Sequence, residues 1–279
     1  MTSEWFPPGQ LLCEYISAYV LSDYDIKDFS NSITCAYPSG SAVLCFSLDG
    51  AVHFKELGSK KIIRHSKFNF IHQLKRPRFY QVISFPDKIL HVVFKPFGAY
   101  RILGIPQNCD FNEDGTALSD LFGAGIAALL NQIEDAGRDS NRVIQLVNEW
   151  LETQLIKNER NDVNRIHHAC KLIDDHLGGF CIEKLTREVC LSKRALEYKF
   201  EEQVGLLPKL YGRIIRFNGL LDVVQNNKRV DWKELAFKYG YFDQAHLIKE
   251  FKHFSGSPPG HFQGIRSIVS GRPILLISK

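Results

Sequence analysis

Two stretches of the chain carry side chains whose hydrogen-bonding groups match those on the edges of DNA bases. Arginine and lysine can donate to guanine, glutamine can pair with adenine, glutamate can accept from cytosine, and alanine can contact the thymine methyl group. The side chains that we expect to face outward are Ser192, Lys193, Arg194, Glu197 and Tyr198 in the first stretch, and Gln244, Ala245, His246 and Lys249 in the second.

The two stretches belong to an internal repeat with a constant offset of 51 residues. The repeated pattern is a leucine, a phenylalanine four residues later, and then a glycine, a proline and an aromatic residue. Leucine and phenylalanine at this spacing share one helix face, and glycine followed by proline ends a helix. The first copy is Leu196, Phe200, Gly205, Pro208 and Tyr211, and the second is Leu247, Phe251, Gly256, Pro259 and Phe262.

A shorter amphipathic helix and a tight turn precede each copy, so that each copy reads as a helix-turn-helix. The turns are Cys190-Leu191 and Gly240-Tyr241-Phe242, and Gly240 can adopt the left-handed conformation that ends a helix. Ser192 and Asp243 are the predicted N-caps of the two second helices, because their side-chain oxygens can accept from an unpaired backbone N–H.

A single helix is predicted to join the two units, since apolar residues recur from Leu210 to Val224 at spacings of three and four. This arrangement would let the second helix of each unit enter successive major grooves, about 34 Å apart. Basic residues on and around this helix and the second unit are candidates for phosphate contacts, which position a protein without specifying sequence. They are Lys209, Arg213, Arg216, Lys228, Arg229 and Lys252.

The distribution of charge agrees with a polyanionic partner for the C-terminal half. Residues 1–164 carry 16 Lys and Arg against 19 Asp and Glu, whereas residues 165–279 carry 19 against 12. The overall composition, 44% hydrophobic and 24% charged, is that of a globular protein and excludes a largely disordered chain. No apolar run is long enough to span a membrane and no signal peptide is evident, so we expect a cytoplasmic protein without a membrane partner.

The N-terminal half is predicted to be β-rich, and the whole chain to be of the α+β class. Strands are expected at Ser41–Leu48, Ala51–Phe54, Phe79–Phe85 and Ile89–Phe94, with a turn at Asp49-Gly50. Helical periodicity begins near Ala117, and the polar stretch 158–164 reads as a linker. The predicted domains are therefore 1–157, β-rich with helices at its end, and 165–265, all helical.

No pattern for catalysis, metal or cofactor binding emerges from the remaining residues. The seven cysteines lack a C-x-x-C pair, and they read as small buried apolar residues in a reducing compartment. Phosphate-loop, G-x-S-x-G and H-E-x-x-H motifs are absent, so we expect neither an enzyme, a metal site nor a cofactor. One alternative is an enzyme in the N-terminal half with a DNA-binding domain attached. Another is a non-specific architectural DNA binder.

The repeat resembles the DNA-binding domain of AraC-type transcriptional regulators. The resemblance rests on residues 191–200 with Gly205 and Pro208, and on residues 231–251 with Gly256 and Pro259. It implies a seven-helix domain over about 166–262 with two helix-turn-helix units, in a sequence-specific regulator that usually activates transcription. Leu220 stands where alanine is usual and Ala245 where serine is common, and both departures are mild.

The N-terminal half resembles the β-rich, often cupin-like sensor domains attached to such regulators, and it would then serve effector sensing or dimerisation. The H-x-H pair of a metal-binding cupin is missing from this half. The predicted partner is double-stranded DNA. RNA polymerase, a small-molecule effector and a second copy of the chain stay open as further partners, and Arg101 is a candidate anchor for an anionic effector whose other binding residues are unknown.

Overall fold

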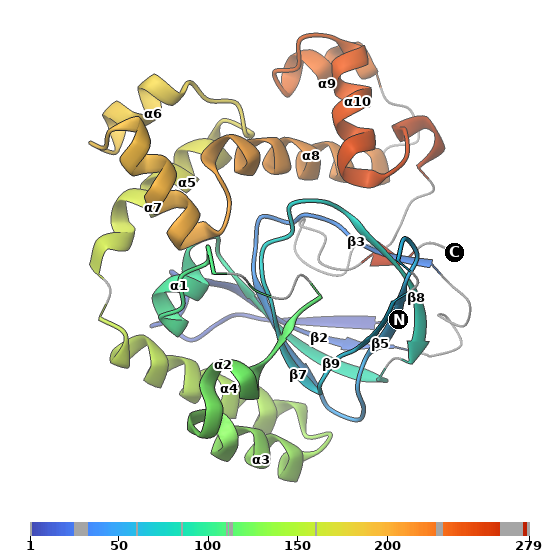
Figure 1. Cartoon of the computed structure of the whole chain (residues 1–279), viewed down its shortest axis with the longest axis vertical. Coiled ribbons are helices and arrows are strands. Elements are labelled where there is room, and N and C mark those ends of the chain that lie inside the picture. Colours follow the sequence, from blue (N-terminus) through green and yellow to red (C-terminus); the bar gives the residue numbers. More distant parts are fainter. Residues whose placement is uncertain are drawn as a thin grey trace. The chain divides into compact units, whose positions relative to one another are not determined.

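The computed structural model describes residues 2–24, 33–59, 61–84, 86–109, 111, 114–159, 161–226, 231–262 and 276–277. They form two compact units, which are described separately. The first comprises Met1–Ile33, Ser41–His72 and Phe79–Asn161, and the second Thr34–Gly40, Gln73–Arg78 and Asp162–Lys279. The predicted α+β class is confirmed, since strands dominate the first unit and helices the second (Figure 1).

The first unit combines a six-stranded antiparallel sheet, in the order β1-β2-β9-β4-β7-β10, with a smaller group of strands β8, β5 and β6. Its strands are β1 (Thr2–Phe6), β2 (Ile16–Asp23), β4 (Val43–Ser47), β5 (His53–Glu56), β6 (Ile62–Arg64), β7 (Phe68–Ile71), β8 (Arg78–Ser84), β9 (Lys88–Phe94) and β10 (Thr116–Ala117). Its helices are α1 (Gly98–Leu103), α2 (Leu118–Phe122), η2 (Gly123–Ile126), α3 (Ala127–Ala136) and α4 (Ser140–Lys157).

Helices cover one face of the six-stranded sheet, and the core of this unit lies between the helices and that face. Alternate strand residues such as Leu44, Phe46 and Val92 point into the same buried cluster as Val147 and Leu151 of α4. One apolar layer thus lies between the sheet and the helices. The alternating strand residues form one side of it, and the apolar face of the helices forms the other.

The predicted strands form, but two consecutive pairs do not become hairpins. The run Ser41–Leu48 contains β4 and the run Ile89–Phe94 forms most of β9, and these two pair with each other. The runs that follow β4 and precede β9 contribute β5 and β8, which belong to the smaller group. The turn at Asp49-Gly50 therefore carries the chain from one sheet to the other.

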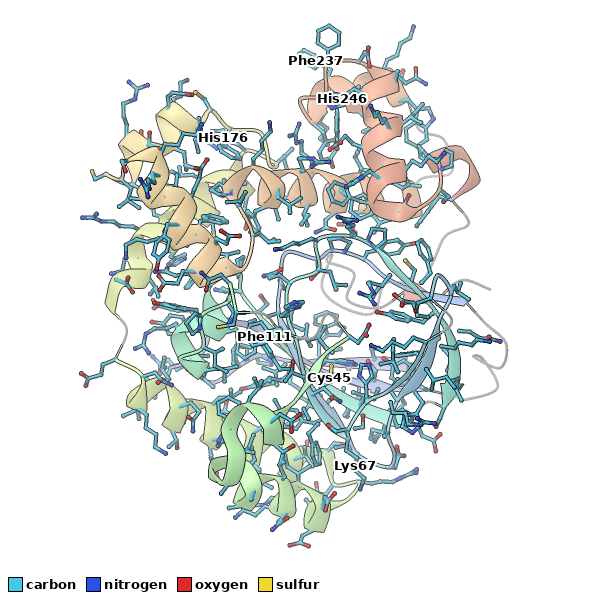
Figure 2. The ribbon with its side chains drawn as sticks, viewed as in Figure 1. Cys45, Lys67, Phe111, His176, Phe237 and His246 are labelled. Carbon is cyan, nitrogen blue, oxygen red and sulfur yellow. The ribbon has the colours of Figure 1, made fainter. Side chains whose placement is uncertain are left out.

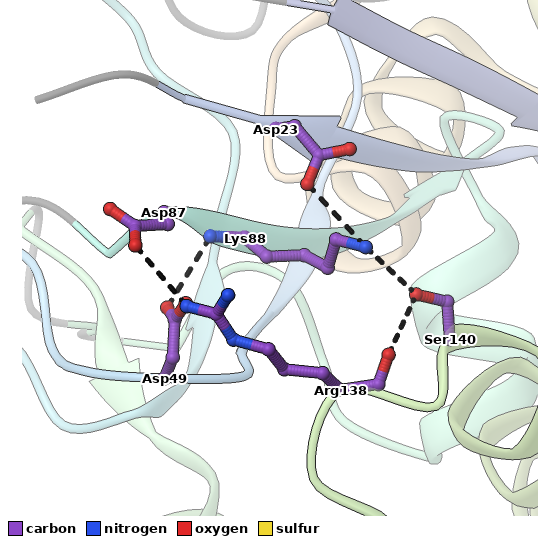
Figure 3. A network of polar contacts seen from close by, with 6 residues as sticks. All are labelled: Asp23, Asp49, Asp87, Lys88, Arg138 and Ser140. Atoms are coloured by element: carbon purple, nitrogen blue, oxygen red, sulfur yellow. Dashed lines mark hydrogen bonds and ion pairs between the residues drawn. The ribbon is translucent and has the colours of Figure 1, made fainter.

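A group of charged side chains holds the turns at one end of this unit (Figure 3). Arg138, between α3 and α4, donates to Asp49 at 2.6 Å and to Asp87 at 3.2 Å. The Lys88 ammonium lies 3.5 Å from Asp23 and donates to the Ser140 hydroxyl at 3.4 Å. The neighbouring carboxylate of Asp49 raises the pKa of Arg138. Because Arg138 is exposed, this group fixes the geometry of the turns more than it stabilises the fold.

A buried histidine, His91, and a half-buried one, His65, make the stability of the first unit depend on pH. His91 on β9 lies opposite Cys45 on β4, and burial lowers the pKa of His91 from 6.5 to about 4. Burial also lowers the pKa of His65 to about 4. Because the two histidines take up a proton at a higher pH in the unfolded chain than in the folded one, the free energy of unfolding falls as the pH drops from 6.5 towards 4. The decrease is about 3 kcal/mol for His91.

Urea unfolding of the wild type and of His91→Gln at pH 7 and pH 4.5 measures this effect. We expect the variant to lose less stability than the wild type between the two pH values, because it retains only the contribution of His65 and the carboxylates. Equal losses in the two proteins would show that His91 does not carry the effect.

The second unit is built from helices arranged around α8 (Figure 1). Its helices are η3 (Asn161–Val163), α5 (Asn164–Asp175), α6 (Ile182–Glu188), α7 (Lys193–Val204), α8 (Pro208–Asn226), α9 (Trp232–Lys238), α10 (Gln244–Ser255) and η4 (Pro259–His261). Asn161 itself is the last residue of the first unit. Strand β3 (Ile33–Ala36), largely in this unit, pairs with β11 (Leu276–Ile277).

A segment from the N-terminal half of the sequence, Thr34–Gly40, belongs to this helical unit. The ring of Tyr37 packs against Phe217 of α8 with centroids 6.0 Å apart. The buried Asn218 side chain donates to the carbonyl oxygen of Ser39 at 2.9 Å. The sequence did not predict this segment, because nothing in its local pattern indicates which distant helix it covers.

The cysteines are all free thiols, but their predicted burial is wrong for four of them. Cys35 and Cys170 are buried and Cys45 is partly so, whereas the remaining four, Cys13, Cys109, Cys181 and Cys190, are exposed. Sequence reasoning assigned burial from residue type alone, and turns such as the one at Cys190 place the thiol outside.

Among the helices that the structure describes, none is long and apolar enough to cross a lipid bilayer.

Candidate nucleic-acid interface

Both predicted helix-turn-helix units form, and their second helices are capped as expected. Ser192 accepts from the backbone N–H of Ala195 at 3.2 Å at the start of α7. Asp243 accepts from the backbone N–H of His246 at 2.7 Å at the start of α10. Each cap satisfies a donor that the first turn of a helix leaves unpaired. The residues nearest to these caps therefore lie on capped helix ends.

The turns between the helices reverse through a left-handed residue in each unit. Gly240 has a φ of 66°, as its residue type predicts, and Cys190 has a φ of 52°. A left-handed conformation costs a residue with a side chain roughly 1–2 kcal/mol, so Cys190 holds the first turn under backbone strain that Gly240 avoids.

Helix α8 joins the two helix-turn-helix units, as the sequence predicted, and its side chains also bond to the second of these units. Arg213 makes two hydrogen bonds to Glu250 of α10, at 2.8 and 2.9 Å. Burial alone would raise the pKa of Glu250, but the Arg213 guanidinium outweighs it and holds this pKa low. The Arg216 guanidinium lies 5.2 Å from the centre of the Tyr241 ring and donates to the Gly240 carbonyl at 3.4 Å.

The predicted base-reading residues gather at the starts of α7 and α10 with different degrees of exposure. Glu197 and Gln244 are half-buried. The exposed ones are Ser192, Lys193, Arg194, Tyr198, Ala245, His246 and Lys249. Each helix thus presents a basic and polar edge to solvent, while Leu196 and Leu247 anchor the opposite side in the core. Direct base contact by these residues stays a prediction.

The predicted phosphate-contacting residues divide into two kinds. Lys209 and Lys252 are exposed and carry positive charge at the surface. Arg213 and Arg216 are half-buried and already engaged with Glu250, Tyr241 and Gly240, so a phosphate would have to compete with these partners. Lys228 and Arg229 lie outside the described residues. The phosphate roles of all of these residues stay predictions.

Two phenylalanines of the second helix-turn-helix unit are almost completely exposed, and the sequence analysis did not single them out. Phe237 of α9 is 89% exposed and Phe242, immediately before the N-cap of α10, is 92% exposed. Figure 2 shows the Phe237 ring projecting from α9 away from the ribbon. Comparing the two turns residue by residue would have singled out Phe242, because it occupies a position that the first turn lacks.

Among the residues that the structure describes, no group of three or more histidine, cysteine or acidic side chains could hold a metal ion. A pocket of about 330 Å³ opens between α5 and α6. Its polar side chains are His176, Cys181, Lys184 and Glu188.

One family model matches most of the helical unit. The family model described as "Helix-turn-helix domain" matches residues 185–264. The Arabinose operon regulatory protein of Escherichia coli (strain K12) is 27% identical over 156 residues, which are 52% of this chain and 50% of that protein. Its Salmonella typhimurium counterpart is 26% identical over 146 residues, 48% of this chain and 52% of that protein. The chain spans about half the length of the curated relatives that it matches.

Among solved structures, ToxT from Vibrio cholerae is similar over most of both chains. The match covers 86% of this chain and 96% of ToxT, with 14% sequence identity and a TM-score of 0.46.

Proposed function

We propose that the chain is an AraC-type regulator that binds DNA at specific sequences and controls transcription, because its helical unit matches a helix-turn-helix family model and part of the chain is similar to the arabinose operon regulatory proteins. The single observation that supports the proposal is the pair of capped second helices, α7 and α10, each with an exposed polar and basic edge and joined through α8. Two such helices in one unit suit the reading of two successive major grooves on one face of a duplex.

In this proposal the exposed residues of α7 and α10 read base edges, and Lys209 and Lys252 neutralise phosphates. Arg213 and Arg216 contribute chiefly by fixing α10 and its turn to α8. Residues 165–265 are the DNA-binding domain, 158–164 the linker, and 1–157 a domain for effector sensing or dimerisation. The regulator acts in the cytoplasm, as an activator that works with RNA polymerase, and it performs no covalent chemistry.

Selection from a random duplex library tests the proposal with the full-length chain. We expect the retained duplexes to share a sequence, and the chain to bind that sequence roughly 10³-fold or more tightly than shuffled DNA at physiological salt. Recovery without a shared sequence, or equal affinity for selected and shuffled duplexes, would contradict sequence-specific binding.

A further inference from the structure

The two helix-turn-helix units differ by one residue in the turn. In both, a backbone N–H after the left-handed residue donates back to the first helix, from Leu191 to Thr186 and from Tyr241 to Ala236. Leu191 and Tyr241 are therefore equivalent. The N-cap follows Leu191 directly in the first unit, but Phe242 stands between Tyr241 and the N-cap in the second. Phe242 is thus an extra residue at the tip of the second recognition helix.

This extra residue sits on a firmly held piece of backbone. The N–H of Phe242 donates to Nδ1 of His246 at 3.4 Å. The neighbouring Tyr241 is 7% exposed, and its ring meets the His246 ring edge-on with centroids 5.3 Å apart. Arg216 covers the same tyrosine ring. The backbone before and after the phenyl group is therefore fixed before any partner arrives.

The phenyl ring itself is 92% exposed, which leaves a large apolar surface in water beside a polar, basic helix end. Residues near the start of a recognition helix are those that reach base edges in the major groove. In that groove the apolar group available to such a ring is the 5-methyl group of thymine. Because the backbone is already held, only the two side-chain torsions of the phenylalanine become ordered on contact, which keeps the entropic cost of the contact small.

We propose that Phe242 is a specificity-determining residue that contacts the 5-methyl group of one thymine in the half-site read by α10. The inference rests on the proposed function and extends it to a residue at the helix tip. Phe242 then adds an apolar contact to the polar contacts of Gln244 and His246, and it has no equivalent in the half-site read by α7.

The test uses the duplex recovered by selection, with each thymine replaced in turn by deoxyuridine, which lacks only the methyl group. For the wild type we expect about a fourfold loss of affinity at one thymine, the effect of exposing one buried methyl-sized group. Phe242→Ala should lose affinity for the thymine duplex by a similar or larger factor and no longer distinguish thymine from deoxyuridine at that position. Contacts by Ala245 to another thymine would persist in this variant.

Phe237→Ala is the matched control, because Phe237 is equally exposed but lies on the first helix of the same unit. This variant should discriminate thymine from deoxyuridine as the wild type does. The inference is overturned if Phe242→Ala retains full discrimination, or if it weakens binding without any change in discrimination, as a contact to backbone or to a protein would. A selection that recovers no common sequence would overturn the proposed function, and this inference with it.

Discussion

Replacing Arg194 by alanine is expected to reduce affinity for the selected duplex by roughly 10- to 100-fold while changing affinity for random DNA less than about threefold. Arg194 is exposed at the second position of α7, two residues after the N-cap Ser192. A guanidinium at this place can donate two hydrogen bonds to O6 and N7 of guanine, and such a pair contributes about 1–3 kcal/mol of discrimination. Titration of both duplexes with the full-length variant measures the two affinities.

Lys252→Ala supplies the contrast for this experiment, since Lys252 is exposed and predicted to contact phosphate. Its removal should weaken binding to both duplexes by similar factors. The slope of log affinity against log salt concentration should also become shallower by about one. If Arg194→Ala behaves in the same way as Lys252→Ala, then Arg194 contacts the backbone and does not read a base.

Replacing Gly178 by alanine is expected to destabilise the helical unit by about 3 kcal/mol or more. Gly178 follows α5 with a φ of 81°, and its N–H closes that helix on the carbonyl oxygen of Ile173. A Cβ atom there would overlap the carbonyl oxygen of Gly212 in α8 and crowd the backbone of Arg216. The close approach of this turn to α8 thus requires glycine for two reasons, the left-handed backbone and the missing side chain.

Thermal unfolding followed at the helical circular dichroism band measures the loss, with a decrease in Tm of roughly 6–12 °C expected. Gly240→Ala is the matched control, because Gly240 has a similar φ of 66° but no atom within 4 Å of the added Cβ. It should lose only the strain, about 1–2 kcal/mol. Equal losses in the two variants would show that the approach of Gly178 to α8 adds nothing.

Most of the helical unit could be predicted because its signals are local and repeated. The caps at Ser192 and Asp243, the left-handed Gly240 and the apolar stripe of α8 each follow from residue type and spacing along a single helix or turn. The constant offset of the repeat let each copy support the interpretation of the other, although it hid the extra residue Phe242 in the second turn.

The remainder depends on contacts between residues far apart in the sequence. The alternation in β4 and β5 predicts two strands but not that they enter different sheets, because pairing partners come from elsewhere in the chain. The sequence around Tyr37 does not predict that its ring packs against α8. Arg213 reads as a surface cation until Glu250, 37 residues later, is brought against it.

A chemical footprint on the selected duplex tests the central claim most directly. Protection of guanine N7 and of the backbone by the full-length chain should fall in two major-groove segments, centred about one helical turn of 10–10.5 base pairs apart on one face. Arg194→Ala should weaken one segment and Gln244→Ala the other. A single protected segment, protection confined to the minor groove, or two segments that respond identically to both variants would contradict reading by two recognition helices.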